Sequence, residues 1–422
     1  MVATAPSPYQ PGSKLEIKNH TPPQPYGAYY KNKNSVRTPV RMLVDGDGEH
    51  RVDHMSFVLS NPPLATPVPA ETKSHVLTIV GNIHHRLKEL GGGPYVVSCY
   101  LGTDESCQYV AKIYDGFEYA LAKSENENDC MWRADLHYSR EAAAYESLPL
   151  RFQGSIVPRY FGSWTFPLAT GVPGRQRWVR MILIEYIHGE CMSDTLRHVE
   201  RPKRGWESPQ PINDSLLPPE KERLDILARI VEAKVAIWWY GGVQHGDLAP
   251  RNVMISRSGP SNAVPRIVII DFNAAYVLHR CEHGRQILAS LGPDNSLPLS
   301  PIEHYWPGSS FSSRGEFAAW LPVSWATADP DESDVLALNW LVSRWKGSPN
   351  FQPPSDQFLD WQSHKDMDQD MQQHVEELRA MRAQDGKTAD QRGQRETNEV
   401  NTDRSNASLP EIIGESPGSP MV

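Results

Sequence analysis

Cysteine is scarce in this 422-residue sequence, and its arrangement excludes two classes of small stabilised protein. The five cysteines are odd in number and scattered along the chain, and no two of them form a C-x-x-C pair. A disulfide framework or a zinc ribbon needs cysteines paired at defined spacings. We therefore expect neither, and we expect a reducing compartment in which free thiols persist.

Long hydrophobic runs are also missing. No apolar stretch approaches the roughly 18 residues that a membrane span requires, and residues 1–8 lack the basic and apolar regions of a secretory signal. These absences predict a soluble intracellular protein with no membrane partner, located in the cytoplasm or the nucleus. The basic run within residues 197–204 suits a nuclear-localisation signal, although such runs are more often solvated linkers.

Positive charge is in deficit. The chain has 42 lysines and arginines against 51 aspartates and glutamates, which gives a formal net charge of −9. A protein that binds nucleic acid through its phosphates usually presents a basic face. We therefore expect no nucleic-acid partner.

The composition nevertheless supports a buried core, because 39% of the residues are hydrophobic and 22% are charged. The length predicts two or three structural units. Residues 1–75 are predicted to form a mostly disordered, Pro-rich arm. Two units follow at 76–187 and 188–350. Residues 351–422 form a tail, in which a helix at 364–382 is followed by a disordered remainder.

Hydrophobic periodicity defines the elements of the two central units. The first unit combines strands with one helix, and the second begins with the strongest helical pattern in the chain. That order predicts an α+β, two-lobed architecture. The expected strands are 95–101, 109–113, 156–164, 178–187, 253–256 and 266–270, and the expected helices are 139–148 and 219–240.

Two short segments carry the clearest chemical pattern. The first is H-G-D-L-A-P-R-N, which starts at His245, and the second is I-I-D-F-N, which starts at Ile269. They resemble the catalytic loop H-R-D-x-x-x-x-N and the D-F-G motif of the protein-kinase-like fold. In phosphoryl transfer such a set supplies one carboxylate that orients the attacking hydroxyl, and an amide and a second carboxylate that hold Mg²⁺ against the phosphates.

The resemblance covers roughly residues 76–350 and is strongest to a divergent fungal protein-kinase-like group. It implies a two-lobed fold with a small β-rich N-lobe and a reduced helical C-lobe. It also implies ATP and Mg²⁺ as cofactors. Within the two segments it assigns acceptor orientation to Asp247, metal ligation to Asn252 and Asp271, and a positive charge near the γ-phosphate to Arg251.

Upstream residues fit the same family in the same order. The V-A-K-I run around Lys112 resembles the kinase strand whose lysine binds the α- and β-phosphates of ATP. Glu141 resembles the helix glutamate that pairs with this lysine, and Glu146 is a competing candidate. The resemblance further implies that the carbonyl of Glu185 and the N–H of Ile187 bind the adenine edge.

The glycine-rich loop is the poorest match. Val97 suits the valine of G-x-G-x-x-G-x-V by its distance from Lys112, but of the three glycine positions only Gly92 holds a glycine. A backbone cradle for phosphates needs the close approach that glycine allows. This departure weakens the expectation of tight nucleotide binding.

Two further departures bear on the substrate. Gly246 replaces the arginine of H-R-D, and H-G-D is typical of aminoglycoside- and choline-kinase-like phosphotransferases. Arg251, four positions after Asp247, resembles the tyrosine-kinase version of the loop. The resemblance thus implies transfer of the γ-phosphoryl group of ATP to a hydroxyl of a protein or of a small molecule. The alternative is an inactive pseudokinase that acts as a binding scaffold.

Overall fold

The structure is a computed structural model. It describes residues 7–27, 30, 37–40, 53–84, 91–122, 128–171, 173–194, 217–257, 264–290, 297–302, 316–326 and 330–354. The predicted helix at 364–382 lies outside the described residues.

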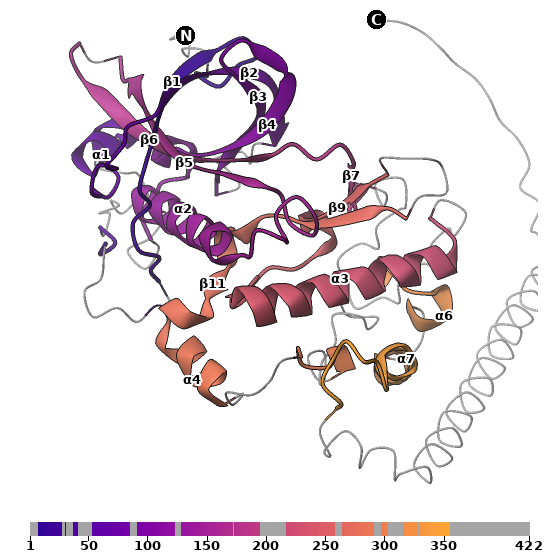
Figure 1. Ribbon diagram of the computed structural model, residues 1–422. Coiled ribbons are helices and arrows are strands. Elements are labelled where there is room, and N and C mark those ends of the chain that lie inside the picture. The colour runs from indigo at the N-terminus through magenta and orange to yellow at the C-terminus, as the bar shows by residue number, and fades with distance from the viewer. Residues whose placement is uncertain are drawn as a thin grey trace, which may run out of the picture. The chain divides into compact units, whose positions relative to one another are not determined.

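Six antiparallel strands close into a barrel in the order β1-β2-β3-β4-β6-β5 (Figure 1). The barrel closes where Lys18 and Asn19 of β1 pair with Thr165 and Trp164 of β5. Closure leaves no free sheet edge that another chain could extend. The strands are β1 (Lys14–Asn19), β2 (Ser74–His84), β3 (Tyr95–Leu101), β4 (Asp104–Tyr114), β5 (Tyr160–Ala169) and β6 (Gln176–Glu185).

The two faces of the barrel strands have different neighbours, because successive side chains of a strand point to opposite sides. On β4, Ala111 and Ile113 point into the barrel and join its interior cluster. Val110 and Tyr114 point outward and join a second cluster, which extends beneath the barrel. Lys112 lies between these two on the outward face. The alternation thus directs the charged side chain of Lys112 toward the element that packs on the outer face of the barrel.

That covering element is helix α2 (Cys130–Ser147). It begins at Asp129, whose carboxylate accepts a hydrogen bond of 2.7 Å from the backbone N–H of Trp132, and it ends just before Pro149. Three consecutive alanines, Ala142 to Ala144, are fully buried in the second cluster and let the helix approach its neighbours closely. The helix predicted at 139–148 is therefore confirmed, and it starts nine residues earlier than expected.

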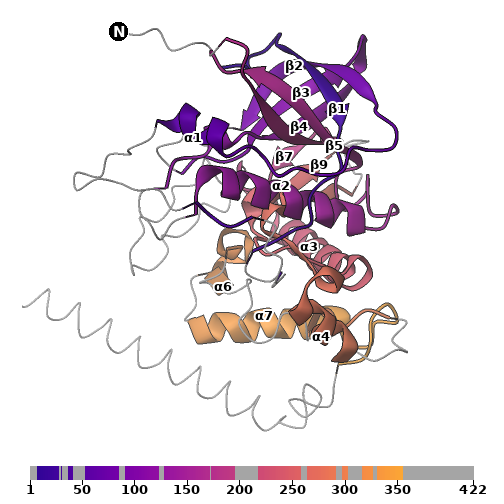
Figure 2. The same cartoon turned by 90° about the vertical axis from the view of Figure 1, so that its left-hand side faces the viewer.

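Helix α3 (Glu220–Gly241) confirms the strongest helical prediction and ends at Gly242, which adopts the left-handed conformation with φ of 59°. Successive layers of barrel, α2, α3 and α7 are visible in two perpendicular views (Figures 1 and 2). None of the described helices is long and apolar enough to cross a membrane. The other helices are α1 (His54–Ser60), α4 (Glu282–Ser290), α6 (Val323–Ala326) and α7 (Pro330–Trp345).

Short strands and single turns of 3₁₀ helix connect these layers. The strands β10, β9 and β7 form a small sheet, and β11 pairs with β8. These strands are β7 (Glu190–Cys191), β8 (Val243–Gln244), β9 (Val253–Ser256), β10 (Arg266–Ile269) and β11 (Tyr276–Val277). The 3₁₀ turns are η2 (Gly116–Glu118), η5 (Pro250–Asn252), η6 (Phe272–Ala274), η7 (Leu278–Arg280) and η8 (Ala318–Trp320).

The expected two-lobed, protein-kinase-like fold is wrong. The strands form a closed barrel rather than a small β-rich lobe, and the described residues that follow it contain few helices rather than a helical lobe. The physical reason is β1, which comes from the segment predicted to be a disordered arm. Its pairing with both β2 and β5 turns the sheet into a ring.

The described residues between 7 and 40, hereafter the N-terminal strap, run from the barrel to α2 and to the segment after residue 271. The Tyr9 hydroxyl donates to Asp115 at 2.7 Å. The Tyr26 hydroxyl donates to the carbonyl of Trp132 on α2, also at 2.7 Å. Tyr30 accepts from the backbone N–H of Val277 on β11. Isolated tyrosines with polar partners produce no hydrophobic period, so the sequence does not reveal this packing.

The contribution of β1 can be tested with two neighbouring residues of that strand. Ile17 is fully buried in the barrel, whereas Glu16 is exposed. We expect Ile17→Ala to lower the free energy of unfolding by about 2–5 kcal/mol, because it leaves a cavity in a closed core. Glu16→Ala should change it by less than about 0.5 kcal/mol. Urea unfolding measures both, and equal midpoints would show that β1 does not help to close the barrel.

Candidate functional site

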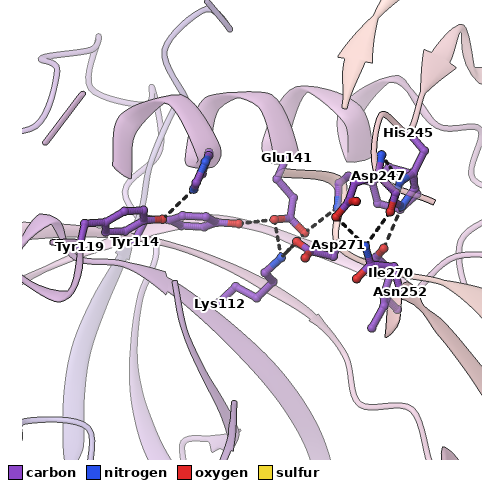
Figure 3. Close-up of polar contacts among 11 residues, drawn as sticks. Lys112, Tyr114, Tyr119, Glu141, His245, Asp247, Asn252, Ile270 and Asp271 are labelled. Atoms are coloured by element: carbon purple, nitrogen blue, oxygen red, sulfur yellow. Dashed lines mark hydrogen bonds and ion pairs between the residues drawn. The ribbon is translucent and has the colours of Figure 1, made fainter. Parts of the chain in front are cut away.

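The site centres on the ammonium group of Lys112 (Figure 3). The lysine residue is 6% exposed. Its Nζ donates to both carboxylate oxygens of Glu141 on α2, at 2.8 and 2.6 Å. It also donates to Oδ1 of Asp271 at 2.6 Å. One cation therefore joins a barrel strand, a helix and the turn that precedes η6.

The two carboxylates keep this buried ammonium charged. Burial opposes the charge of Lys112, but Asp271 and Glu141 outweigh it and raise the pKa of the lysine. Burial also raises the pKa of Glu141, although Lys112 opposes this shift. Burial also tends to raise the pKa of Asp271, but the charge of Lys112 outweighs this effect and lowers the pKa of Asp271 below its usual value. Asp271 is thus held in its ionised form.

Glu141, and not Glu146, is the partner of the lysine. Glu146 is five positions further along α2, and its carboxylate pairs with Arg280 at 3.3 Å. Glu141 is fully buried and faces the barrel. The structure thus decides between the two glutamates that the sequence left as candidates.

His245 organises the next part of the site through its ring. Its Nδ1 accepts from the backbone N–H of Asp247 at 3.2 Å, so the proton resides on Nε2, which donates to the carbonyl of Ile270 at 2.9 Å. Burial lowers the pKa of His245, which favours this neutral form. The ring thereby couples the 245–252 segment to the residue just before Asp271.

Asp247 lies at the more exposed end of the site. Its backbone carbonyl and its Oδ2 accept from the amide nitrogen of Asn252, at 2.7 and 3.1 Å. Its Oδ1 accepts from Arg251, whose other terminal nitrogen reaches Glu316 at 3.3 Å. The side chain of Asp247 is 37% exposed. Two donors therefore orient a carboxylate that solvent and solutes can still reach.

Asp271 has an unusual backbone. With φ of 66° it is the one non-glycine residue in the described part of the chain that has a positive φ. This conformation carries strain for most side chains, and such strain tends to occur at functional sites. The backbone N–H of Ile270 donates to the carbonyl of Asn252, and the next ring, Phe272, packs between Tyr145 and His245. These contacts hold Asp271 beside Asn252.

Gly246 explains one departure from the kinase pattern. Its φ is 79°, and an added Cβ would lie 2.5 Å from the carbonyl oxygen of Ala274. No side chain fits there without moving η6. The arginine of H-R-D therefore has no place in this backbone.

The predicted nucleotide-binding roles of Gly92 and Val97 do not match their positions. Val97 is fully buried inside the barrel, and the β3 residue paired with Lys112 is Val96. Gly92 packs against backbone, because an added Cβ would collide with the carbonyl of Glu118. The N–H of Gly93 also donates to that carbonyl. This turn is bound to the chain and not presented as a phosphate cradle.

Glu185 and Ile187 lie where β6 leaves the barrel for β7. The carboxylate of Glu185 takes both terminal nitrogens of Arg266, at 2.6 and 3.0 Å, and the backbone N–H of Arg159 at 3.0 Å. Its side chain therefore ties the barrel to β10. Ile187 is half-buried in the connection, and its backbone role toward adenine stays a prediction.

The donor set suits a hard divalent cation bound together with phosphates. Asp271 supplies a carboxylate that is 31% exposed, and Asn252 directs its amide nitrogen to Asp247, so its oxygen is the atom left for an ion. The described residues contain no cluster of three or more His, Cys, Asp or Glu side chains that could hold a metal. Mg²⁺ is commonly held by only one or two carboxylates plus substrate phosphates.

Two residues that contribute to the site lie outside the motifs of the sequence. Tyr114 donates to Glu141, and Glu316 pairs with Arg251. Only Tyr114 had a readable signal, because it follows Lys112 by two positions and so shares its face of the strand.

No family model matches the chain, and no curated protein is significantly similar to it.

The constraint on Gly246 can be measured against a glycine of similar backbone. Gly246→Ala should lower the free energy of unfolding by about 2 kcal/mol or more, because strain at positive φ is compounded by a clash. Gly12 has φ of 86° and no neighbour within 4 Å of an added Cβ, so Gly12→Ala isolates the strain. Its loss should be about 1 kcal/mol. Equal losses in thermal unfolding would remove the packing explanation for Gly246.

Proposed function

We propose that this protein is an ATP- and Mg²⁺-dependent phosphotransferase that moves a γ-phosphoryl group to a hydroxyl acceptor. The observation that carries the proposal is the ammonium of Lys112, held between Glu141 and Asp271. Close beside it, the 245–252 segment fixes Asp247 and Asn252. Polar residues from four separate segments thus meet, and each has a role in phosphoryl transfer.

Lys112 is the group that binds phosphate. Glu141 holds its ammonium extended on the outer face of β4, and a phosphate arriving there would replace Asp271 as the second partner of the lysine. Asp271 and Asn252 would then hold Mg²⁺ through oxygen ligands. When bound, the ion neutralises charge that develops on the phosphoryl oxygens.

Asp247 orients the acceptor hydroxyl and receives its proton. Asn252 and Arg251 fix the direction of its carboxylate, and its exposure allows an acceptor to approach. Arg251 is half exposed and adds positive charge at the same point. The proposal covers both a protein and a small molecule as the acceptor, and the test must offer both.

The charge of Asp247 is the most direct test. We expect Asp247→Asn to reduce phosphoryl transfer by about 10²–10⁴-fold, because it removes the base and keeps the size. Mg·ATP binding should be unchanged, since Asp247 does not contact the phosphate-binding lysine. Transfer from [γ-³²P]ATP to mixed peptides and to metabolite pools measures the rate.

The matched control is Asp225→Asn. Asp225 is a half-exposed aspartate that pairs with Arg344 at 3.1 Å, much as Asp247 pairs with Arg251, but it lies on α3. Its variant should transfer phosphate at the rate of the unmodified protein. Equal, measurable rates for the Asp247 and Asp225 variants would refute the proposed mechanism.

A second candidate is a binding scaffold without turnover. It is favoured by the turn at Gly91–Gly93, whose backbone is bound to residues 118–120 and not presented to a ligand. Under this alternative, Lys112 stays paired with Asp271 when the protein functions. No phosphate displaces Asp271 from the lysine.

Thermal unfolding with ATP and with Mg·ATP separates the two candidates. An enzyme should be stabilised more by Mg·ATP than by ATP, and Asp271→Asn should abolish this difference, because binding to the folded state raises the melting temperature. The control Asp225→Asn should retain it. Absence of any shift in the unmodified protein would support the scaffold.

A further inference from the structure

The exposed end of the site contains a contact that the proposed transfer does not use. Arg251 donates through one terminal nitrogen, Nη2, to Oδ1 of Asp247, and through the other, Nη1, to Oε2 of Glu316 at 3.3 Å. Among the described residues, its guanidinium has these two partners. One planar cation thus joins the carboxylate that orients the acceptor to a second carboxylate, which lies 65 positions further along the chain than Arg251.

Glu316 is held more weakly than the other carboxylates of the site. Its distance to Arg251 exceeds the roughly 2.7–2.9 Å of a strong charge-assisted hydrogen bond. Its side chain is 60% exposed, and Arg251 is the one donor that it has within the described part of the chain. Asp247, in contrast, accepts from both Arg251 and Asn252. Exposed ion pairs of this kind contribute little to stability, so another acid can displace Glu316 readily.

The geometry of the guanidinium favours an acid as the group that displaces Glu316. Arginine presents its N–H groups in a rigid fork that matches the oxygens of a carboxylate. When an acceptor hydroxyl lies at Asp247, the nitrogen that now faces Glu316 lies beside that acceptor. Exchange of one carboxylate for another keeps Arg251 paired. A cationic substituent would instead compete with Arg251 for Glu316 and leave that nitrogen without a partner.

We propose that Arg251 selects acceptors that carry a carboxylate close to the reacting hydroxyl, and that Glu316 occupies the position of this carboxylate until the acceptor binds. The part of the proposal that concerns turnover rests on the proposed phosphotransferase function. The preference in binding does not, and can be measured without turnover. An acidic peptide and a small hydroxy acid offer the same chemistry, so the experiment includes both.

Binding is measured by ligand-observed NMR with full-length protein and Mg·ADP, which allows no transfer. The peptide probes are capped Ala-Ser-Asp-Ala and Ala-Tyr-Asp-Ala, each compared with its Asn counterpart. The small-molecule probes are D-glycerate and its neutral amide. Each pair differs in charge and keeps its size. We expect the acidic member to bind about two- to fivefold more tightly, the effect of one partly exposed charge pair. The series in which this preference occurs identifies the source of the acceptor.

Three variants assign the preference to this contact. Glu316→Gln removes the competing charge, so it should tighten binding of the acidic probes by a further two- to fivefold, or about the value of one exposed pair, and leave the neutral probes unchanged. Arg251→Gln should abolish the preference. The matched control is Asp225→Asn, which removes an equal charge from the half-exposed pair with Arg344 on α3 and should change neither affinity.

Equal affinities for the acidic and neutral probes, in both unmodified protein and Glu316→Gln, would overturn the proposal whatever the turnover. So would tighter binding of peptides with Lys in place of Asp, if Glu316→Gln abolished it, because Glu316 would then be a site for cations. If the protein transfers phosphate, Glu316→Gln should lower KM for the acidic acceptor only. A changed KM for ATP instead would assign Nη1 to the nucleotide and overturn the proposal. A preference for acidic probes in a protein without any turnover would refute the phosphotransferase and leave the selectivity of Arg251 established.

Discussion

A single buried ammonium is the interaction on which this structure depends most. Lys112 is nearly inaccessible to water, so its charge requires Glu141 and Asp271, and the fully buried carboxylate of Glu141 in turn requires the lysine. The three groups come from a barrel strand, a helix and a strained turn. Neither the packing of α2 against the barrel nor the path of the chain at Asp271 can change without leaving a buried charge uncompensated.

The N-terminal strap restrains α2, the helix that carries Glu141. The N-terminal strap contacts α2 through Tyr26 and reaches β11 through Tyr30, so it spans the helix that carries Glu141 and the segment that follows Asp271. The guanidinium of Arg140, one position before Glu141, also lies over the ring of Tyr30. A segment that looks like a flexible arm in the sequence thus restrains the least adjustable part of the site.

The sequence predicted what depends on local pattern. Lys112 and Asp271 were found because each ends or interrupts an apolar strand within a recognisable motif, and α3 was found because its stripe of apolar residues has a helical period. What depends on distant pairing was missed. Lys18 pairs with Thr165 through tertiary structure that no local period reveals. Val97 was matched to a glycine-rich loop by its distance from Lys112, but the β3 residue paired with Lys112 is Val96, and Val97 belongs to the barrel interior.

The pairing that closes the barrel also imposes an order on synthesis. Once β2 has left the ribosome it is the one barrel partner of β1 that exists, because the strand that contains Thr165 has not yet been made. The sheet of β1 to β4 then has two unpaired edges until residues 160–185 emerge and form β5 and β6, which close the barrel. Unpaired edges are the part of a β-protein that most readily joins other chains. The half-built barrel is therefore the species in which the nascent chain is most exposed to aggregation, and closure removes both vulnerable edges in one step.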